Sequence, residues 1–198
     1  HRDTMPDDGV VLMKPVPANT SVCPGVALLT APAIKEEVTV QTSLGPVKGF
    51  TQLGGATGGT AAHFRGIPFA ATTAGENRFK PPQPREAWSD ALDCTRYGAE
   101  CREPTGAMRG MMKGFGKSVP EDVAVGATGD DCLNLNVVTP STTGGARAPV
   151  MVWIHGGANV MSGGNGSGFG AAPTCGEKFA AEGVCAVSIH YRQGIHGF

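Results

Sequence analysis

The sequence has 198 residues, which fits one domain of ordinary size or part of a larger one, and 40% of them are apolar. Its 16 basic and 17 acidic residues are interspersed and give a formal net charge of -1, which argues against nucleic acid or an anionic membrane as a partner. Thirty glycines and fifteen prolines indicate many turns, but they follow no fixed period, so collagen and simple repeats are excluded.

The first 35 residues show few signals of folded structure. Residues 1–35 are interrupted by prolines and lack strand or helix periodicity, so we expect a disordered extension ahead of one folded unit at 36–198. Within the extension, Val22–Ala33 is interpreted as loose chain rather than a cleaved signal peptide, because Pro24 interrupts it. The sequence starts at His1 and stops directly after a strand-like run, which favours a fragment. No run approaches the roughly eighteen apolar residues of a membrane span.

The first half of the folded unit is expected to contain short strands and loops. The segment 38–50, VTVQTSLGPVKGF, alternates in hydrophobicity, breaks at the Leu-Gly-Pro of 44–46 and resumes, which predicts a β-hairpin. AAHFRGIPFA, at 61–70, predicts a further strand. The prolines of 76–88 exclude a helix interior and a central strand there. The Gly- and Met-rich segment 98–129 is interpreted as an exposed loop.

The second half of the folded unit has clearer patterns. CLNLNVVTP, at 132–140, alternates as an amphipathic strand does. The continuous apolar runs at 148–157 and 183–192 are typical of strands buried on both faces, and CGEKFAAEG, at 175–183, predicts a short helix between them. Strand, helix and strand together predict the βαβ unit of a parallel sheet, and therefore an α/β fold.

Neither a metal site nor a cofactor site is predicted. The six cysteines form no Cys-x-x-Cys pair, and no histidine stands at zinc-finger spacing. GMMKGFGKS, at 110–118, ends like a phosphate-binding loop, but Met111 occupies the position of the required glycine. We therefore interpret this segment as a flexible basic loop and expect no metal and no cofactor.

The run His155-Gly156-Gly157 follows an apolar strand, at the edge of a parallel sheet where reactive groups gather. Glycine allows backbone N–H groups to approach a ligand closely. A row of such donors is what an oxyanion needs when an acyl carbon becomes tetrahedral. The alternative is that these glycines only make a tight turn after the strand.

Eight stretches, in order, are similar to the N-terminal part of the type-B carboxylesterase and cholinesterase family of α/β-hydrolases. They are GPVKGF (45–50), FRGIPFA (64–70), RFKPPQP (78–84), Trp88, LDCTRYGAEC (92–101), DDCLNLNVVTP (130–140), PVMVWIHGGA (149–158) and GVCAVSIHYRQGIHGF (183–198). The resemblance implies the N-terminal portion of an α/β-hydrolase fold, in which a small antiparallel hairpin region is followed by a mostly parallel sheet, incomplete here.

The resemblance also implies two features near the sheet edge. In the family, two oxyanion-hole donors are backbone N–H groups, which here belong to Gly157 and Ala158. The early disulfide of the family joins the two cysteines that correspond to Cys101 and Cys132. It would close a loop of about thirty residues.

A third implied feature is an ion pair. The family pairs the arginine of the Arg-Phe stretch with the acid before the second of those cysteines, which gives Arg78 with Asp131. Asp131 stands where the family usually has glutamate. Asn159 follows the glycine run where an aromatic is common. His190 and Gln193 replace the usual asparagine and leucine, so the chain is interpreted as a divergent member.

The serine nucleophile of the family is missing from the 198 residues, because Gly-x-Ser-x-Gly occurs nowhere. In the family the serine, the acid and the histidine of the triad all follow the Gly-Phe stretch, so they are expected beyond Phe198. His155 and His196 are not candidates for the missing base. We interpret His155 instead as a residue that holds the loop by hydrogen bonding.

The resemblance implies a carboxylic ester hydrolase that acts on a small-molecule ester through a serine acyl-enzyme, to which this chain contributes the oxyanion-hole loop while being inactive alone. The alternative is a cholinesterase-like adhesion or binding protein that keeps the fold without the triad. A short product that acts as a decoy is a third interpretation. The sequons at Asn19 and Asn165 are compatible with a secreted or extracellular location, and a cytoplasmic one is the alternative.

Overall fold

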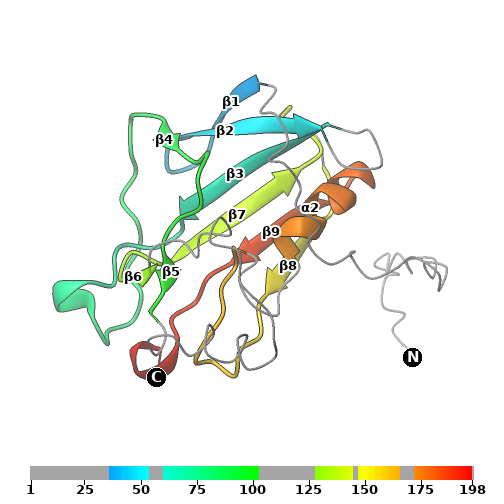
Figure 1. Ribbon diagram of the computed structural model, residues 1–198. Helices are drawn as coiled ribbons and strands as arrows, with labels where there is room; N and C mark the ends of the chain where they lie inside the picture. The colour runs from blue at the N-terminus through cyan, green and yellow to red at the C-terminus, as the bar shows by residue number, and fades with distance from the viewer. Residues whose placement is uncertain (1–35, 54–59, 103–127, 145–146, 166–171, 198) are drawn as a thin grey trace, which may run out of the picture.

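The computed structural model describes residues 36–53, 60–102, 128–144, 147–165 and 172–197 (Figure 1). The elements are β1 (Glu36–Gln41), β2 (Pro46–Leu53), β3 (Thr60–Pro68), η1 (Gly75–Asn77), β4 (Leu92–Asp93), β5 (Glu100–Cys101), β6 (Thr128–Gly129), β7 (Asn134–Thr139), β8 (Val150–Ile154), α2 (Ala172–Ala181), β9 (Cys185–Ile189) and η2 (Gly194–His196), where η marks a 3-10 helix. Within these residues, seven strands form one mixed sheet in the order β1-β2-β3-β7-β9-β8, with β4 paired to β2. The extension expected at 1–35 and most of the loop expected at 98–129 lie outside the described residues.

The predicted β-hairpin is confirmed as β1 and β2, which pair antiparallel. Thr42 closes the turn, because its backbone N–H and its hydroxyl both donate to the carbonyl of Gly45, at 3.0 and 2.6 Å. A side chain at Gly45 would collide with Trp88, whose indole N–H donates to the carbonyl of Pro46 at 2.8 Å. The glycine that interrupts the alternation in the sequence therefore lies in the turn, and the proline begins β2.

The main apolar core lies between the hairpin region and the segment that carries β4. Val47, Ala62, Phe64 and Cys94 are buried against one another. Cys94 has no exposed surface, and burial raises the pKa of its thiol to about 11, so it packs as a small, neutral, apolar side chain. The strand predicted at 61–70 is confirmed as β3, which forms part of this core.

β7 has the alternation that the sequence predicts, but its more buried face carries two polar side chains. Asn134, Asn136 and Val138 are buried, whereas the residues between them are half-buried. The side-chain amide of Asn134 donates to the carbonyl of Ala99 at 2.9 Å, and Asn136 Oδ1 accepts the N–H of Gly66 at 2.9 Å. These buried amides satisfy one backbone group of a loop and one at the register shift of β3 between Phe64 and Ile67.

The predicted βαβ unit is confirmed, because β8 and β9 pair in parallel and α2 connects them. α2 lies across β7 and β9 (Figure 1), and Gly176 permits the contact, since a Cβ there would come within 2.8 Å of Val138 Cγ2. The prediction that both strands are buried on both faces is wrong, because β9 is mostly half-buried, with only Ser188 buried. Among the described residues β8 lies at one edge of the sheet, with Val150 and Ile154 62% and 64% exposed.

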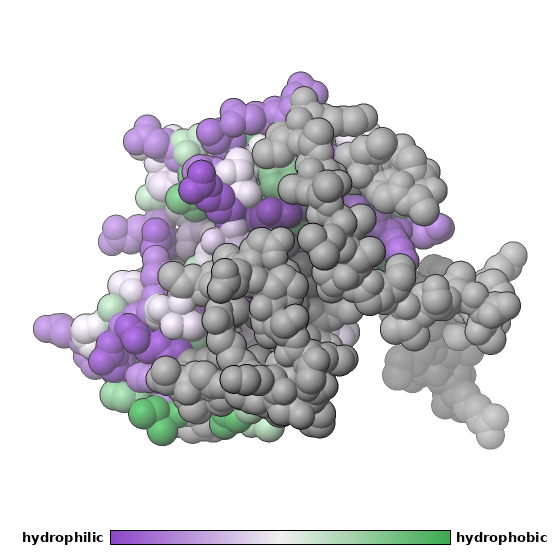
Figure 2. Space-filling model, viewed as in Figure 1, coloured by the Kyte–Doolittle hydropathy of each residue, from purple (hydrophilic) through white to green (hydrophobic). Residues whose placement is uncertain are grey.

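Apolar residues are also exposed near η2. Figure 2 shows hydrophilic residues over the upper left of this face and hydrophobic residues along its lower edge, where η2 lies in Figure 1. Phe79 and Ile195 are largely exposed, and the Phe79 ring stacks on His196 with 5.6 Å between centroids.

No helix among the described residues has the length and hydropathy to cross a membrane.

A disulfide joins Cys101 in β5 to Cys132, two residues before β7. The two Cα atoms are 4.8 Å apart, and the bridge closes a separation of 31 residues. β5 pairs with β6 immediately before this point, in a two-stranded sheet of its own. The bridge therefore ties both ends of the segment between residues 101 and 132 to the start of β7.

A cavity of about 210 Å³ lies between the sheet and α2, and its lining includes His63, Arg65, Tyr97 and Phe179. The Arg65 guanidinium lies over the rings of Phe50 and Tyr97, at 4.8 and 4.3 Å from their centroids. Burial, assisted by the positive charge of Arg65, lowers the pKa of His63 to about 4. His63 is therefore neutral at pH 7, which avoids a second buried positive charge beside the guanidinium.

Loss of the disulfide should destabilise the chain measurably. The double variant Cys101→Ser/Cys132→Ser removes the closed loop, and the chain-entropy model gives a decrease of about 3 to 4 kcal/mol in the free energy of unfolding. Urea denaturation of the oxidised chain and of the double variant measures the difference. Reductant should lower the midpoint of the parent chain and leave that of the variant unchanged. Equal midpoints for the two chains would contradict a stabilising role.

His63 should make stability fall with decreasing pH. Between pH 6.5 and 4 the unfolded chain binds a proton at His63 that the folded chain does not, so up to about 3 kcal/mol of stability is lost over that window. His63→Phe keeps a ring to stack on Phe50 and removes the titration. Urea denaturation from pH 7.5 to 4 should show a shallower pH dependence for the variant. An identical pH dependence in both chains would show that His63 does not carry the effect.

Candidate functional site

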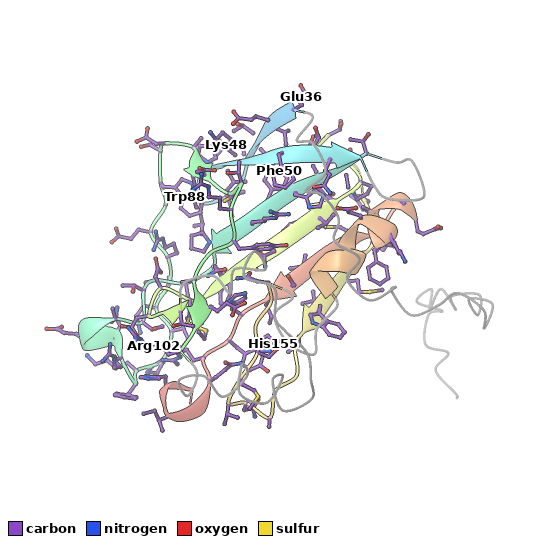
Figure 3. The ribbon with its side chains drawn as sticks, viewed as in Figure 1. Glu36, Lys48, Phe50, Trp88, Arg102 and His155 are labelled. Atoms are coloured by element: carbon purple, nitrogen blue, oxygen red, sulfur yellow. A yellow bond between two sulfur atoms is a disulfide. The ribbon has the colours of Figure 1, made fainter. Side chains whose placement is uncertain are left out.

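Two loops leave the sheet side by side at the carboxyl ends of β8 and β9. The strands are parallel, with Ile154 aligned to Ile189, so the segments that follow them emerge at the same edge. We call residues 155–165 the glycine loop. Figure 3 shows His155, its first residue, at the lower end of β8. Residues 190–197 form the second loop and contact the glycine loop along its length.

The glycine loop contains a tight turn of unusual backbone conformation. Gly157, Ala158, Asn159 and Ser162 have φ values of 132°, 54°, 59° and 85°. The N–H groups of the two residues after Asn159 both donate to the carbonyl of Gly157, at 3.0 and 3.1 Å. A Cβ at Gly157 would collide with the carbonyl oxygen of Met161, whereas one at Gly156 would meet open space. Only the second glycine of the pair is therefore required by the shape of the loop.

The two predicted oxyanion-hole residues lie in this turn. Ala158 is exposed and Gly157 is half-buried. Among the described residues, no backbone carbonyl accepts a hydrogen bond from the N–H of either residue. A backbone N–H in an exposed turn that is not used by such a carbonyl can donate to an anion.

His155 is a structural residue of the glycine loop. Its ring is buried and stacks on Tyr191, with 4.3 Å between centroids, and the Tyr191 hydroxyl donates to the His155 carbonyl at 2.6 Å. His155 Nδ1 lies 2.9 Å from the carbonyl of Gly156, which only accepts, so Nδ1 carries the proton. Burial lowers the pKa of His155, so its ring is neutral. These contacts agree with its interpretation as a residue that holds the loop.

A buried polar network ties the end of the glycine loop to the sheet. Asn165 Oδ1 accepts from Asn136 Nδ2 at 3.1 Å and lies 3.0 Å from His190 Nε2. Ser188 Oγ donates to the carbonyl of Gly164 at 2.8 Å. Burial, and to a smaller extent the neighbouring His155, lowers the pKa of His190 to about 4, so its neutral ring takes part in the network at pH 7.

Sequence reasoning missed this network, although its signal is visible. The asparagines at alternate positions of β7 and the histidine in place of asparagine at 190 are polar residues in apolar runs. The network also removes Asn165 from consideration as a glycosylation acceptor, because its buried carboxamide is occupied by Asn136, His190 and the carbonyl of Gly98. The second sequon, at Asn19, lies outside the described residues.

The prediction that Arg78 pairs with Asp131 is wrong, because Arg78 pairs with Asp130 instead. Arg78 Nη2 lies 2.6 Å from Asp130 Oδ2, and Arg102 Nε lies 2.8 Å from Asp130 Oδ1. The carbonyl of Asp130 accepts from both the N–H and the hydroxyl of Thr73, which turns this residue toward the segment that carries Arg78. Asp131 is exposed. Successive side chains of an extended chain point in opposite directions, so only one of the two aspartates meets the arginines.

Arg78 and Arg102 both donate hydrogen bonds to the carboxylate of Asp130. Hydrogen bonds from Arg102 and then from Arg78 lower the pKa of its carboxyl group. Figure 3 shows Arg102 beside the lower end of the sheet, near β5. This exposed cluster sets loop geometry more than it adds stability. The described residues contain no group of three or more His, Cys, Asp and Glu side chains that could hold a metal ion.

Comparison with known proteins identifies the family of this chain. Residues 36–198 match the model of the Carboxylesterase family. The para-nitrobenzyl esterase of Bacillus subtilis (strain 168) is 38% identical over 161 residues, which cover 80% of this chain and 28% of that protein. The cocaine esterase of Homo sapiens is 40% identical over 139 residues, which cover 68% of this chain and 23% of that protein.

Solved structures of esterases have the same fold. A thermophilic para-nitrobenzyl esterase is 36% identical with a TM-score of 0.62, covering 81% of this chain and 29% of its own. The juvenile hormone esterase from Manduca sexta is 30% identical with a TM-score of 0.65, covering 82% and 28%. The chain thus spans less than a third of the length of these relatives. The predicted α/β-hydrolase fold is confirmed, and the chain belongs to the carboxylesterase family.

Proposed function

We propose that this chain supplies the oxyanion-hole loop of a carboxylic ester hydrolase, with the N–H groups of Gly157 and Ala158 as two of the donors. The observation that carries the proposal is the left-handed turn after β8. There the Met161 carbonyl excludes a side chain at Gly157, and no described backbone carbonyl accepts from either N–H. Membership of the carboxylesterase family supports this assignment.

The proposed chemistry places this loop opposite a serine nucleophile. When the serine oxygen attacks the ester carbonyl carbon, its proton passes to the triad histidine, the π electrons move to the carbonyl oxygen, and the two N–H groups donate to the resulting oxyanion. The sequence has no Gly-x-Ser-x-Gly, so the serine, its histidine and its acid would come from outside these 198 residues. The names of the relatives mention para-nitrobenzyl, cocaine and juvenile hormone esterases. We extend to this chain only the shared class, a small-molecule carboxylic ester.

The alternative function is a binding or adhesion protein of the same fold without a triad. Both hypotheses share the part of the chain described here, so the nucleophile position discriminates between them. Sequencing the transcript past the codon for Phe198 tests this. Gly-x-Ser-x-Gly within about fifty codons supports the esterase, and another residue in place of the serine supports the binding protein.

We also propose a secreted or extracellular location. The Cys101–Cys132 disulfide supports it, because such bonds persist in oxidising compartments and are rare in the cytosol. A chain isolated from its source with both thiols reduced would favour the cytoplasmic alternative.

The purified 198-residue chain should not turn over esters. Hydrolysis of 4-nitrophenyl acetate should equal that of a heat-unfolded sample, because no serine nucleophile is present. The measurement is release of 4-nitrophenol with and without a serine-directed organophosphate. Turnover that the organophosphate abolishes would overturn the proposal that this chain lacks the nucleophile.

Gly157→Ala should impair catalysis in a gene product that includes the nucleophile. The added Cβ collides with the Met161 carbonyl and displaces the donors, so we expect kcat to fall about 10²- to 10³-fold. Gly156→Ala is the matched control, since its Cβ meets open space and kcat should stay within about twofold. Steady-state kinetics on a 4-nitrophenyl ester measures both. Equal kcat values for the two variants would contradict the assignment.

A further inference from the structure

The side chain of Gln193, in the second loop, hydrogen-bonds to the glycine loop. Its side chain has no exposed surface. Its Nε2 donates to two successive backbone carbonyls, those of Met161 and Ser162, both at 2.9 Å. The next residue, Gly194, donates its N–H to the carbonyl of Asn159 at 2.7 Å. Three carbonyls of the turn are thus held by two consecutive residues after β9.

One of these carbonyls connects Gln193 directly to Gly157. The oxygen of Met161 is the atom nearest to the position that a Cβ on Gly157 would take. The Met161 N–H in turn donates to the Gly157 carbonyl at 3.1 Å. The Gly157 carbonyl shares its peptide plane with the N–H of Ala158, so a displacement of Met161 moves that proposed oxyanion donor.

The turn needs such external support because its own conformation is unfavourable. Ala158 and Ser162 adopt left-handed backbone angles, which cost roughly 1 to 2 kcal/mol for each, and Asn159, a residue that tolerates such angles better, adopts them as well. Residues in such conformations persist only where surrounding contacts hold them. Leucine, which the related family pattern has at position 193, offers no donor to the two carbonyls.

We propose that Gln193 is a positioning residue that fixes the direction of the Gly157 and Ala158 N–H groups, an inference that rests on the proposed oxyanion role of this loop. The carboxamide is suited to the task, because one NH₂ group carries two donors for two adjacent carbonyls. Among the described residues, Gln193 Oε1 has no hydrogen-bond partner, so the two bonds donated to the carbonyls, together with a side-chain contact to Tyr191, orient the amide.

The first test measures loop order in the 198-residue chain. In Gln193→Leu, amide hydrogen exchange at Val160 and Met161, whose N–H groups donate to Gly157, should accelerate about tenfold or more. Gln52→Leu is the matched control, since it removes another buried carboxamide that donates to Glu177 instead. The control should leave those two rates unchanged, and both variants should keep the β7 amides protected. Unchanged exchange at Val160 and Met161 in Gln193→Leu would overturn the proposal.

A second variant tests the proposal even if Gln193→Leu misfolds. Gln193→Glu keeps the side-chain shape but places carboxylate oxygens against two carbonyl oxygens. Protection of Val160 and Met161, relative to the parent chain at the same pH, should be low at pH 8 and recover at pH 5 as the carboxyl group protonates and donates. Gln193→Met keeps most of the volume and removes the donors, so a merely space-filling role predicts parent-like exchange at Val160 and Met161 in that variant, and that result would contradict positioning.

The catalytic consequence is measured in a gene product that includes the nucleophile. Gln193→Leu should lower kcat about tenfold or more with KM nearly unchanged, because the oxyanion forms only in the transition state. If Gly157→Ala retains full activity, the oxyanion assignment fails even where exchange shows that Gln193 orders the loop. If Gly157→Ala is impaired while Gln193→Leu matches the parent in both exchange and kcat, the positioning role alone fails.

Discussion

The close approach of the Met161 carbonyl to the side-chain position of Gly157 sets the shape of the region after β8. It closes a turn so tight that the position of the Gly157 side chain is occupied by backbone, and it brings two N–H groups of the turn onto the Gly157 carbonyl. The residues on either side adopt left-handed angles as a consequence. A turn of this kind is unstable in isolation, so the surrounding structure has to hold it in place.

The side chains that hold this turn in place are polar and buried. β7 contributes Asn136, β9 contributes Ser188, and the loop after β9 contributes His190 and Gln193. Each donates to or orients a group of the glycine loop, and Asn136 and Ser188 lie where apolar side chains would be expected in a central sheet. Buried hydrogen bonds define a unique geometry better than apolar packing does, because an unpaired partner costs about 1 to 3 kcal/mol. The histidine contributes in its neutral form, which its burial favours.

A second set of constraints lies where β5 and β6 meet the start of β7. The disulfide fixes Cys132 to β5, and Asp130, two residues earlier, binds two arginines and the hydroxyl of Thr73. Two residues further on, Asn134 donates to the loop before β5. Covalent, ionic and hydrogen-bonded links therefore converge on five residues of chain, and they hold the entrance to β7 in register with the strands that carry the candidate site.

The sequence alone determined the local elements and the family. Alternation marked the hairpin and β7, the two apolar runs with a helix between them marked the βαβ unit, and the glycines after β8 marked the candidate loop, because these signals depend on neighbours a few residues apart. Tertiary structure decided what depends on distant contacts. It placed β8 at the edge of the sheet, directed Asp130 rather than Asp131 toward Arg78, and brought Gln193 against Met161. No local pattern specifies which of two adjacent side chains meets a partner fifty residues away, since that choice follows from strand order and from the direction in which each loop enters the sheet.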